Sequence, residues 1–174
     1  MKKLFTVIRQ GKLDEVEMIL EKKPELVNCV SGALPKKDHG QSPLQVALKT
    51  GKYEIADYLI SHGADVNKSA SNGFDSINWS ICKAELLFER PTIYPNVQEK
   101  VREQLTRILD ILIENGADYV AWANRGHYPE PYPGPSNKSM YIDDFVPGDE
   151  TDIDRNRDLR LFMQDYFKSR NLKL

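Results

Sequence analysis

The run Gly-Gln-Ser-Pro-Leu-Gln-Val-Ala-Leu at residues 40–48 decides the fold, because the similar run Gly-Phe-Asp-Ser-Ile-Asn-Trp-Ser-Ile occupies residues 73–81. The two runs begin 33 residues apart. The motif Gly-Ala-Asp at residues 63–65 also recurs, at residues 116–118. Self-similarity at a fixed spacing of this size is typical of stacked structural repeats, in which each unit buries its apolar face against its neighbours. The chain is therefore expected to be a repeat protein.

The second unit has the residue pattern of two short helices. Ser42 is placed to cap the first helix, and Pro43 suits its first position because the fixed φ of proline is already helical. This helix is expected over residues 44–50. A second helix is expected over residues 53–61, and Gly63 then suits the left-handed position that ends it.

The first unit repeats this pattern on either side of Gly11. Apolar residues stand at i, i+3 and i+4 in two helical stretches: Leu4, Val7 and Ile8, then Val16, Ile19 and Leu20. Pro24 stops the second stretch. The loop that joins one helix pair to the next is called a finger below. The first finger, around residues 31–39, is longer than its counterpart in the second unit, and we expect it to be enlarged and mobile.

The third unit is expected to carry an insertion at about residues 85–104. Its two flanking Gly-Ala-Asp motifs are 53 residues apart, which exceeds the repeat of 33 by 20. Pro91 and Pro95 lie inside the insertion and predict a bend. The pattern favours a lengthened helix pair, with one helix over residues 77–88 and a returning helix over residues 97–114.

Beyond residue 126 the repeat signal ends, so the repeats are assigned to residues 1–126. Residues 127–154 form a Pro-rich and acidic segment, with six carboxylates and no Lys or Arg among residues 141–154. In the remaining segment, 155–174, apolar residues at helical spacing predict a helix over residues 155–169. Because stacked repeats need a polar cap at each end, this helix is expected to cover the third unit.

Two motifs of the second unit, Ser42–Gly51 and Gly63–Asn67, resemble the ankyrin repeat, with Ser in place of the usual Thr and Gln in place of the usual His. The resemblance covers roughly residues 2–126. It implies an all-α fold, an ankyrin-like helical solenoid of about three repeats with a C-terminal capping helix. It also implies that the chain binds another protein.

Composition and net charge limit the kinds of partner and the cellular compartment that are expected for this chain. The chain has 174 residues, a net charge of −2 and no apolar run of membrane-spanning length, so neither nucleic acid nor a membrane is expected as a partner. No secretory signal pattern begins the chain, and a cytoplasmic location is expected unless export uses another route. Cys29 and Cys82 lack zinc-site spacing and are expected to be reduced thiols.

The sequence carries no recognised catalytic or metal-binding pattern. His39, His62 and His127 lie in three separate turns or loops, without a second ligand at metal-binding spacing. The sequence contains no phosphate-binding loop and no nucleophile elbow. We therefore expect no catalytic residue, no metal and no cofactor. An enzyme with an unrecognised site is kept as a remote alternative.

The resemblance places partner-binding residues on the fingers and on the first helices of the units. These positions are Asp38, His39, Gln41 and Lys49 in the second unit, and Asn72, Phe74 and Lys83 in the third. An aromatic residue at a finger position suits an interface anchor, so Phe74 stands out. The alternative that it packs under the Pro-rich segment stays open. Trp79 and Trp122 are assigned to packing.

The acidic run offers a second candidate surface. Its residues Asp143, Asp144, Asp149 and Asp152 would attract a basic partner protein. They could equally be solvated charge without a partner. The short chain resembles small stand-alone ankyrin-like proteins of bacteria, which are often inhibitors or immunity proteins for toxins. A non-catalytic binding module of that kind is expected, and a scaffold or adaptor protein is the alternative.

Overall fold

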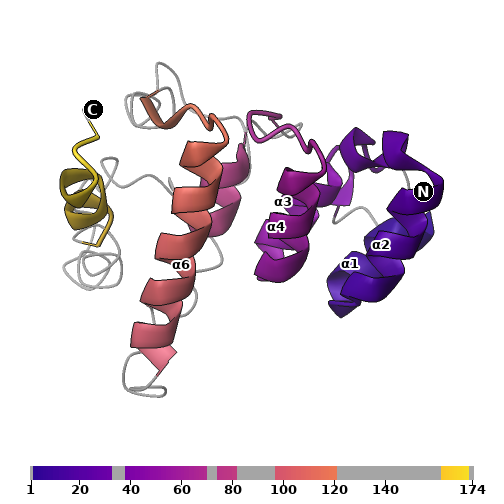
Figure 1. Cartoon of the computed structure of the whole chain (residues 1–174), viewed down its shortest axis with the longest axis horizontal. Coiled ribbons are helices and arrows are strands. Elements are labelled where there is room, and N and C mark those ends of the chain that lie inside the picture. The colour runs from indigo at the N-terminus through magenta and orange to yellow at the C-terminus, as the bar shows by residue number, and fades with distance from the viewer. Residues whose placement is uncertain (1, 33–37, 70–73, 82–96, 121–161, 173–174) are drawn as a thin grey trace, which may run out of the picture. The chain divides into compact units, whose positions relative to one another are not determined.

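The computed structural model describes residues 2–32, 38–69, 74–81, 97–120 and 162–172, and all regular structure in these ranges is helical (Figure 1). The elements are α1 (Lys2–Gln10), α2 (Leu13–Lys22), the 3-10 helix η1 (Pro24–Asn28), α3 (Pro43–Lys49), α4 (Tyr53–Ser61), a short helix at 76–81, α6 (Val97–Glu114) and a helix at 162–169. No described residue lies in a β-strand. The predicted all-α class is confirmed.

The chain divides into two compact units. The first comprises Met1–Lys83 and Gln104–Ala117, and the second comprises Ala84–Glu103 and Asp118–Leu174. The first compact unit therefore contains the first two helix pairs, the helix at 76–81 and residues 104–114 of α6. The predicted boundaries after residues 126 and 154 fall outside the described residues.

The first helix pair forms around Gly11, as predicted. Leu4, Val7 and Ile8 of α1 and Val16 and Leu20 of α2 are buried. Gly11 has φ +74°, a left-handed conformation that side chains rarely adopt, and this lets the chain reverse within two residues. The helix α2 ends at Lys22, and Pro24 opens η1.

The second pair begins at a capping box on α3. The backbone N–H of Gln45 donates to the Ser42 hydroxyl oxygen at 3.3 Å, and the Ser42 N–H donates to the Gln45 side-chain oxygen at 2.8 Å. Pro43 occupies the first helical position, as expected from its missing N–H. After α4, Gly63 adopts φ +85°. The predicted start and end signals of this pair are confirmed.

The third pair consists of the helix at 76–81 and α6. The helix α6 is 18 residues long and α4 is 9, and α6 has the bounds predicted for the returning helix. Residues 77–81 of the predicted outgoing helix are helical. The rest of that helix and the bend at 91–95 lie outside the described residues, so the hairpin insertion stays a prediction.

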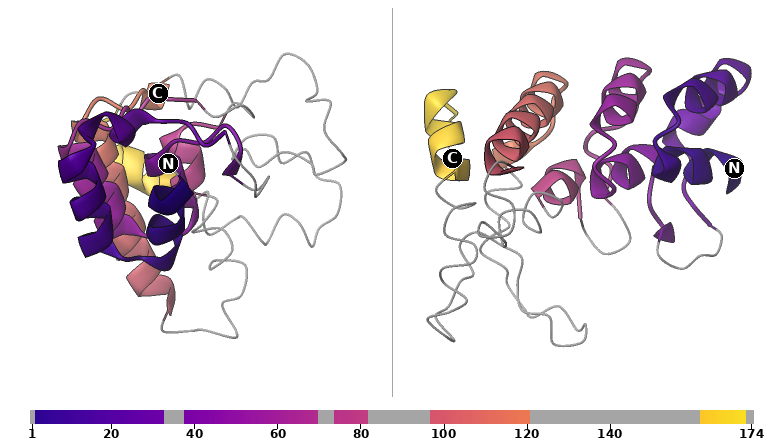
Figure 2. Two further views of the ribbon diagram at one scale, coloured as in Figure 1. Left: turned by 90° about the vertical axis from the view of Figure 1, so that its right-hand side faces the viewer. Right: turned by 90° about the horizontal axis from the view of Figure 1, so that it is seen from below.

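The helices of the first compact unit, which spans Met1–Lys83 and Gln104–Ala117, lie in two layers. Figure 2 (right) shows α1, α3 and the helix at 76–81 side by side, here called the first-helix layer. The second-helix layer contains α2, α4 and residues 104–114 of α6. The most deeply buried side chains come from both layers and include Leu44, Leu48, Ile55, Leu59, Leu105 and Leu109. Their removal from water is the main stabilising contribution to the stack.

Asparagine side chains link one repeat to the next. The Asn28 amide donates to the Gly63 carbonyl at 2.8 Å, and its oxygen accepts from the Asp65 N–H at 2.8 Å. In the next repeat the Asn67 amide donates to the Gly116 carbonyl at 2.7 Å. The backbone groups of the recurrent Gly-Ala-Asp motif therefore form hydrogen bonds with an asparagine side chain of the preceding repeat.

In the second compact unit, the helix at 162–169 buries three of its apolar residues: Met163, Tyr166 and Phe167. The Phe167 ring lies 6.1 Å from that of Tyr119, and the Arg102 guanidinium lies 5.7 Å from the Phe162 ring. Residues 155–161 of the predicted helix lie outside the described residues. Its role as a cap of the third repeat stays a prediction.

Candidate partner-binding surface

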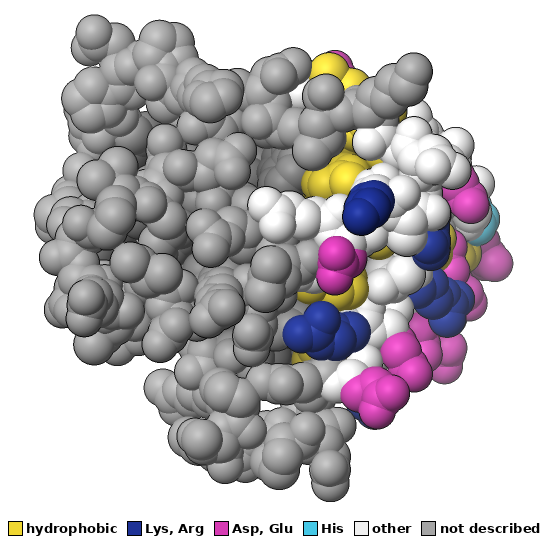
Figure 3. Space-filling model, turned by 90° about the vertical axis from the view of Figure 1, so that its left-hand side faces the viewer, with side chains coloured by type: hydrophobic (Ala, Val, Ile, Leu, Met, Phe, Trp, Pro, Cys, Tyr) yellow, Lys and Arg dark blue, Asp and Glu magenta, His cyan; other side chains and the backbone are white. Residues whose placement is uncertain are grey.

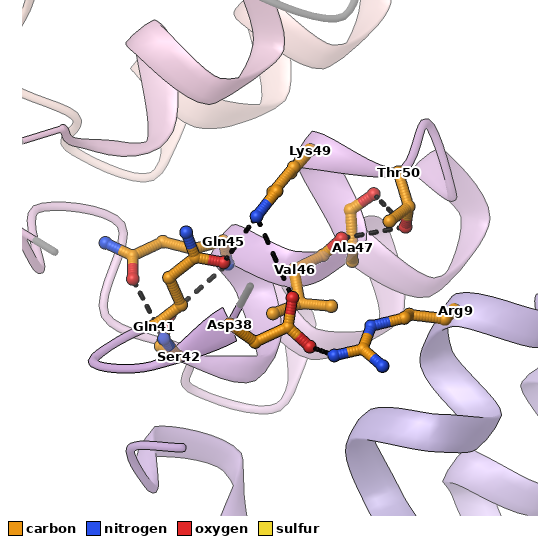
Figure 4. Close-up of polar contacts among 9 residues, drawn as sticks. All are labelled: Arg9, Asp38, Gln41, Ser42, Gln45, Val46, Ala47, Lys49 and Thr50. Carbon is orange, nitrogen blue, oxygen red and sulfur yellow. Dashed lines mark hydrogen bonds and ion pairs between the residues drawn. The ribbon is translucent and has the colours of Figure 1, made fainter. Parts of the chain in front are cut away.

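A buried carboxylate joins the first finger to both neighbouring first helices (Figure 4). Asp38 is only 2% exposed and forms ion pairs with Arg9 of α1 and with Lys49 of α3, whose Nζ lies 3.8 Å from the carboxylate. A carboxylate removed from water requires such partners to remain charged. Asp38 therefore ties the finger to α1 and α3.

Lys49 is the cation of this cluster that also reaches the third repeat. Its Nζ donates to the Gln41 side-chain oxygen at 3.4 Å and lies 5.1 Å from the centre of the Trp79 ring. The side chain is 29% exposed. A cation over an indole face is stabilised by the negative charge density of the ring. Lys49 is thus positioned from three sides and still reaches solvent.

Phe74 packs on the same tryptophan, Trp79, that Lys49 contacts. Its ring centre lies 5.0 Å from that of Trp79 in a tilted arrangement, and its side chain is half-buried. Trp79 is itself buried. Phe74 therefore packs on Trp79, and the Pro-rich segment named in the alternative prediction lies outside the described residues.

Hydrogen bonds to backbone carbonyl groups fix the two fingers beside the cluster. The Ser31 N–H donates to the Gln41 carbonyl, and the Gly40 N–H donates to the Ser31 carbonyl, both at 2.9 Å. The Gln45 amide donates to the carbonyls of Lys68 and Phe74, which lie on either side of the next finger. Gln45, the third residue of α3 and the partner of Ser42 in the capping box, thereby also holds that finger.

The structure brings together four of the residues predicted for partner binding. Asp38, Gln41 and Lys49 are linked directly, and Phe74 joins them through Trp79. Asp38 and Gln41 are buried, so they position Lys49 and are not themselves presented to solvent. His39 is exposed on the finger. Six further predicted residues lie outside the described ranges: Asn72, Lys83, Asp143, Asp144, Asp149 and Asp152.

Two residues of the cluster were not predicted as site residues. Arg9 had no assigned role, and Trp79 was assigned to packing alone. Trp79 is buried as that assignment implies, but its ring also supports Lys49. The sequence signal that could have identified Arg9 was its position. It directly follows the apolar Ile8 and is the one charged residue in the last turn of α1.

Two other chemically reactive side chains, those of His62 and Cys29, lie in surroundings that do not indicate catalysis. The His62 ring stacks on Tyr58 at 3.9 Å, and its Nδ1 lies 2.8 Å from the Tyr58 carbonyl oxygen. Cys29 is a free thiol whose pKa is raised by burial, which disfavours the nucleophilic thiolate. Within the described ranges, no group of three His, Cys, Asp or Glu residues could hold a metal ion. His127 and Cys82 lie outside them.

The surface seen in Figure 3 carries described acidic and basic side chains among neutral ones, with hydrophobic side chains visible between them. None of the helices in the described ranges combines the length and the apolar character that a bilayer crossing demands.

Residues 2–70 match a family model described as ankyrin repeats (3 copies). The match contains α1 to α4 with Arg9, Asp38, Gln41 and Lys49, whereas Phe74 and Trp79 lie beyond it. This part of the chain therefore consists of ankyrin repeats, as the sequence motifs indicated. Ankyrin repeats form a protein–protein interaction module and are generally non-catalytic.

Proposed function

We propose that this chain is a non-catalytic binding module that inhibits its partner, as an immunity protein does for a toxin or enzyme. Contact would be made by the first-helix layer and the adjoining fingers, with Lys49, Phe74 and His39 as direct contacts. Asp38 and Gln41 would hold Lys49 in place. Asn72 and Lys83 belong to the same proposed surface by their positions in the repeat.

The observation that carries this proposal is the cluster around Lys49, a residue of the matched ankyrin repeats. A partly exposed cation is held by Asp38, Gln41 and Trp79, beside the half-buried Phe74. Interfaces are commonly anchored by aromatic and cationic side chains that are already ordered before binding, because less conformational entropy is then lost. The cluster has this composition.

The acidic run would provide a second contact, for a basic patch of the partner. Asp143, Asp144, Asp149 and Asp152 belong to a stretch with six carboxylates and no Lys or Arg. Clustered charge of one sign accelerates association with a partner of opposite sign. We place this binding in the cytoplasm, and the free thiol of Cys29 is compatible with a reducing compartment.

The test is affinity capture from host extract with three baits: wild type, Phe74→Ala, and Met18→Ala as a control. Met18 is 52% exposed on α2, in the other layer. We expect a partner that the wild type and Met18→Ala retain and that Phe74→Ala, with an unchanged circular dichroism spectrum, largely loses. Equal retention by all three baits would reject this surface.

The inhibitor role is tested separately on the captured partner. Its activity is measured with increasing amounts of the ankyrin chain, and a stoichiometric loss of activity is expected. A partner that stays fully active in the complex would instead support the scaffold or adaptor alternative.

A further inference from the structure

We infer that the first-helix layer binds an acidic segment of the partner protein, an inference that rests on the proposed binding function and adds the chemistry of the docked segment. Its basis is the way the two helix layers of the first two repeats divide their charges. This division extends beyond the single cation at Lys49.

Charged residues of opposite sign are sorted between the layers. The helices α1 and α3 contain four basic residues and no acidic one: Lys2, Lys3, Arg9 and Lys49. The helices α2 and α4 contain six acidic residues and a single basic one: Asp14, Glu15, Glu17, Glu21, Glu54 and Asp57, with Lys22. The near-neutral net charge of the chain therefore hides a basic face and an acidic face.

Helix stability explains the acidic face better than the basic one. Asp14 and Glu15 lie in the first turn of α2, and Glu54 lies in that of α4, where the helix dipole favours negative charge. In α1 the first turn instead carries the exposed Lys2 and Lys3, and only Lys3 of the two has an ion pair in the described ranges, with Glu15 of α2 at 3.8 Å. Positive charge there opposes the dipole, and departures from local stability rules concentrate at functional sites.

The Lys49 cluster contains two cationic side chains and one carboxylate. One carboxylate, Asp38, is shared by two cations, Arg9 and Lys49. Lys49 is partly desolvated by Trp79 and is held in one orientation by Gln41. An incoming carboxylate would therefore meet an oriented ammonium group, and charge-assisted hydrogen bonds of this kind are stronger than neutral ones.

A protein carboxylate suits this surface better than a nucleic acid. Single-stranded nucleic acids are usually held by aromatic rings on which bases stack. Here Phe74 and Trp79 pack on each other, 5.0 Å apart. Phe74 instead offers an apolar neighbour for the side chains that flank an acidic residue in a peptide.

The experiment uses a glutamate-rich peptide and a lysine-rich peptide of equal length as probes. The chain has two tryptophans, so Trp122→Phe leaves Trp79, beneath Lys49, as the sole indole reporter. We expect the glutamate-rich peptide to change the Trp79 emission to saturation. Lys49→Met should weaken this binding by about tenfold or more, because it removes the oriented charge and retains most of the apolar stem.

The control is Lys22→Met on the second-helix layer, which should leave binding unchanged. The double variant Lys2→Gln, Lys3→Gln should weaken binding by about two- to fivefold. It should change the melting temperature little, because removing positive charge from the start of α1 offsets the loss of the exposed Lys3–Glu15 ion pair. Loss of binding without loss of stability is an outcome that a purely structural role of these lysines does not produce.

Tighter binding of the lysine-rich peptide, or equal effects of Lys49→Met and Lys22→Met, would overturn the inference. So would stronger binding of a single-stranded oligonucleotide than of the glutamate-rich peptide. The proposed function and this inference can fail separately. If a captured protein loses binding to Phe74→Ala and binds Lys49→Met as well as wild type, the binding function stands and only the acidic ligand is rejected. If the peptide binds as expected and no protein depends on Phe74, the proposed function fails instead.

Discussion

Asp75 and Asn78 exchange hydrogen bonds at the start of the helix at 76–81. The Asn78 N–H donates to the Asp75 carboxylate at 2.9 Å, and the Asp75 N–H donates to the Asn78 side-chain oxygen at 3.3 Å. The same reciprocal pair is made by Ser42 and Gln45, 33 residues earlier. The capping geometry therefore recurs with the repeat although none of the side chains is the same.

Removing this cap should destabilise the protein. Asp75→Ala is expected to lower the free energy of unfolding by about 1 kcal/mol, whereas Asp75→Ser should retain most of the stability because serine also caps helices well. Urea denaturation followed by circular dichroism measures both. Thr6→Ala is the control, since Thr6 makes only an exposed bond within α1. A cost for Asp75→Ala no larger than that of the control would contradict the capping role.

The ion pair of Arg9 should matter more than an exposed ion pair of the same type. Arg9→Met leaves the buried Asp38 carboxylate with only the more distant Lys49, and we expect a loss of about 3 kcal/mol. The matched variant is Arg107→Met, which breaks the exposed pair with Asp57 at 3.3 Å and should cost about 0–1 kcal/mol. Thermal unfolding of the two variants in parallel tests the difference, and equal losses would argue against the buried pair.

Tyr53 should make stability fall in alkaline solution. Burial raises the pKa of its phenol from 10.0 to about 12, because the tyrosinate anion is disfavoured away from water. Between these values the unfolded chain releases the proton and the folded chain keeps it, so stability decreases as the pH rises, by up to about 2–3 kcal/mol in total. Denaturation across this pH window should show a slope that Tyr53→Phe reduces. An identical slope in the variant would show that other groups cause it.

The acidic run should control the rate of association and leave folding nearly unchanged. Asp143, Asp144, Asp149 and Asp152 changed together to Asn should slow association with a basic partner, and added salt should slow the wild type in the same way. Stopped-flow binding to the captured partner gives the rates. The control removes four acidic charges from the second-helix layer by Asp14→Asn, Glu17→Gln, Glu21→Gln and Glu54→Gln. An unchanged rate without salt dependence would eliminate this surface.

The helices and their ends could be predicted from the sequence because their determinants are local. Ser42 and Pro43 start α3, Gly11 separates α1 from α2, and Gly63 adopts the left-handed conformation that its position suggested. The bounds of α6 followed from apolar residues at helical spacing. In each case the residue and the feature it specifies are separated by only a few positions along the chain.

The candidate site was predictable only in part because its pairing is tertiary. Arg9 and Asp38 are 29 residues apart and meet only when the finger folds back on α1. The repeat pattern pointed to Asp38 and Lys49 as finger and helix positions, but it contained no information on which cation Asp38 would bind. The charge division between layers was likewise invisible until each helix could be assigned to a layer.

The asparagine links have a consequence for how the protein comes apart. Asn28 joins the first repeat to the second, and Asn67 joins the second to the third, so each link is a nearest-neighbour coupling in a one-dimensional array. Weakening one link should divide a single cooperative transition into two, with the smaller block melting first. A partner that contacts both α1 and α3 would then stabilise the boundary between the first two repeats. Its binding should raise the melting temperature of the block that contains them.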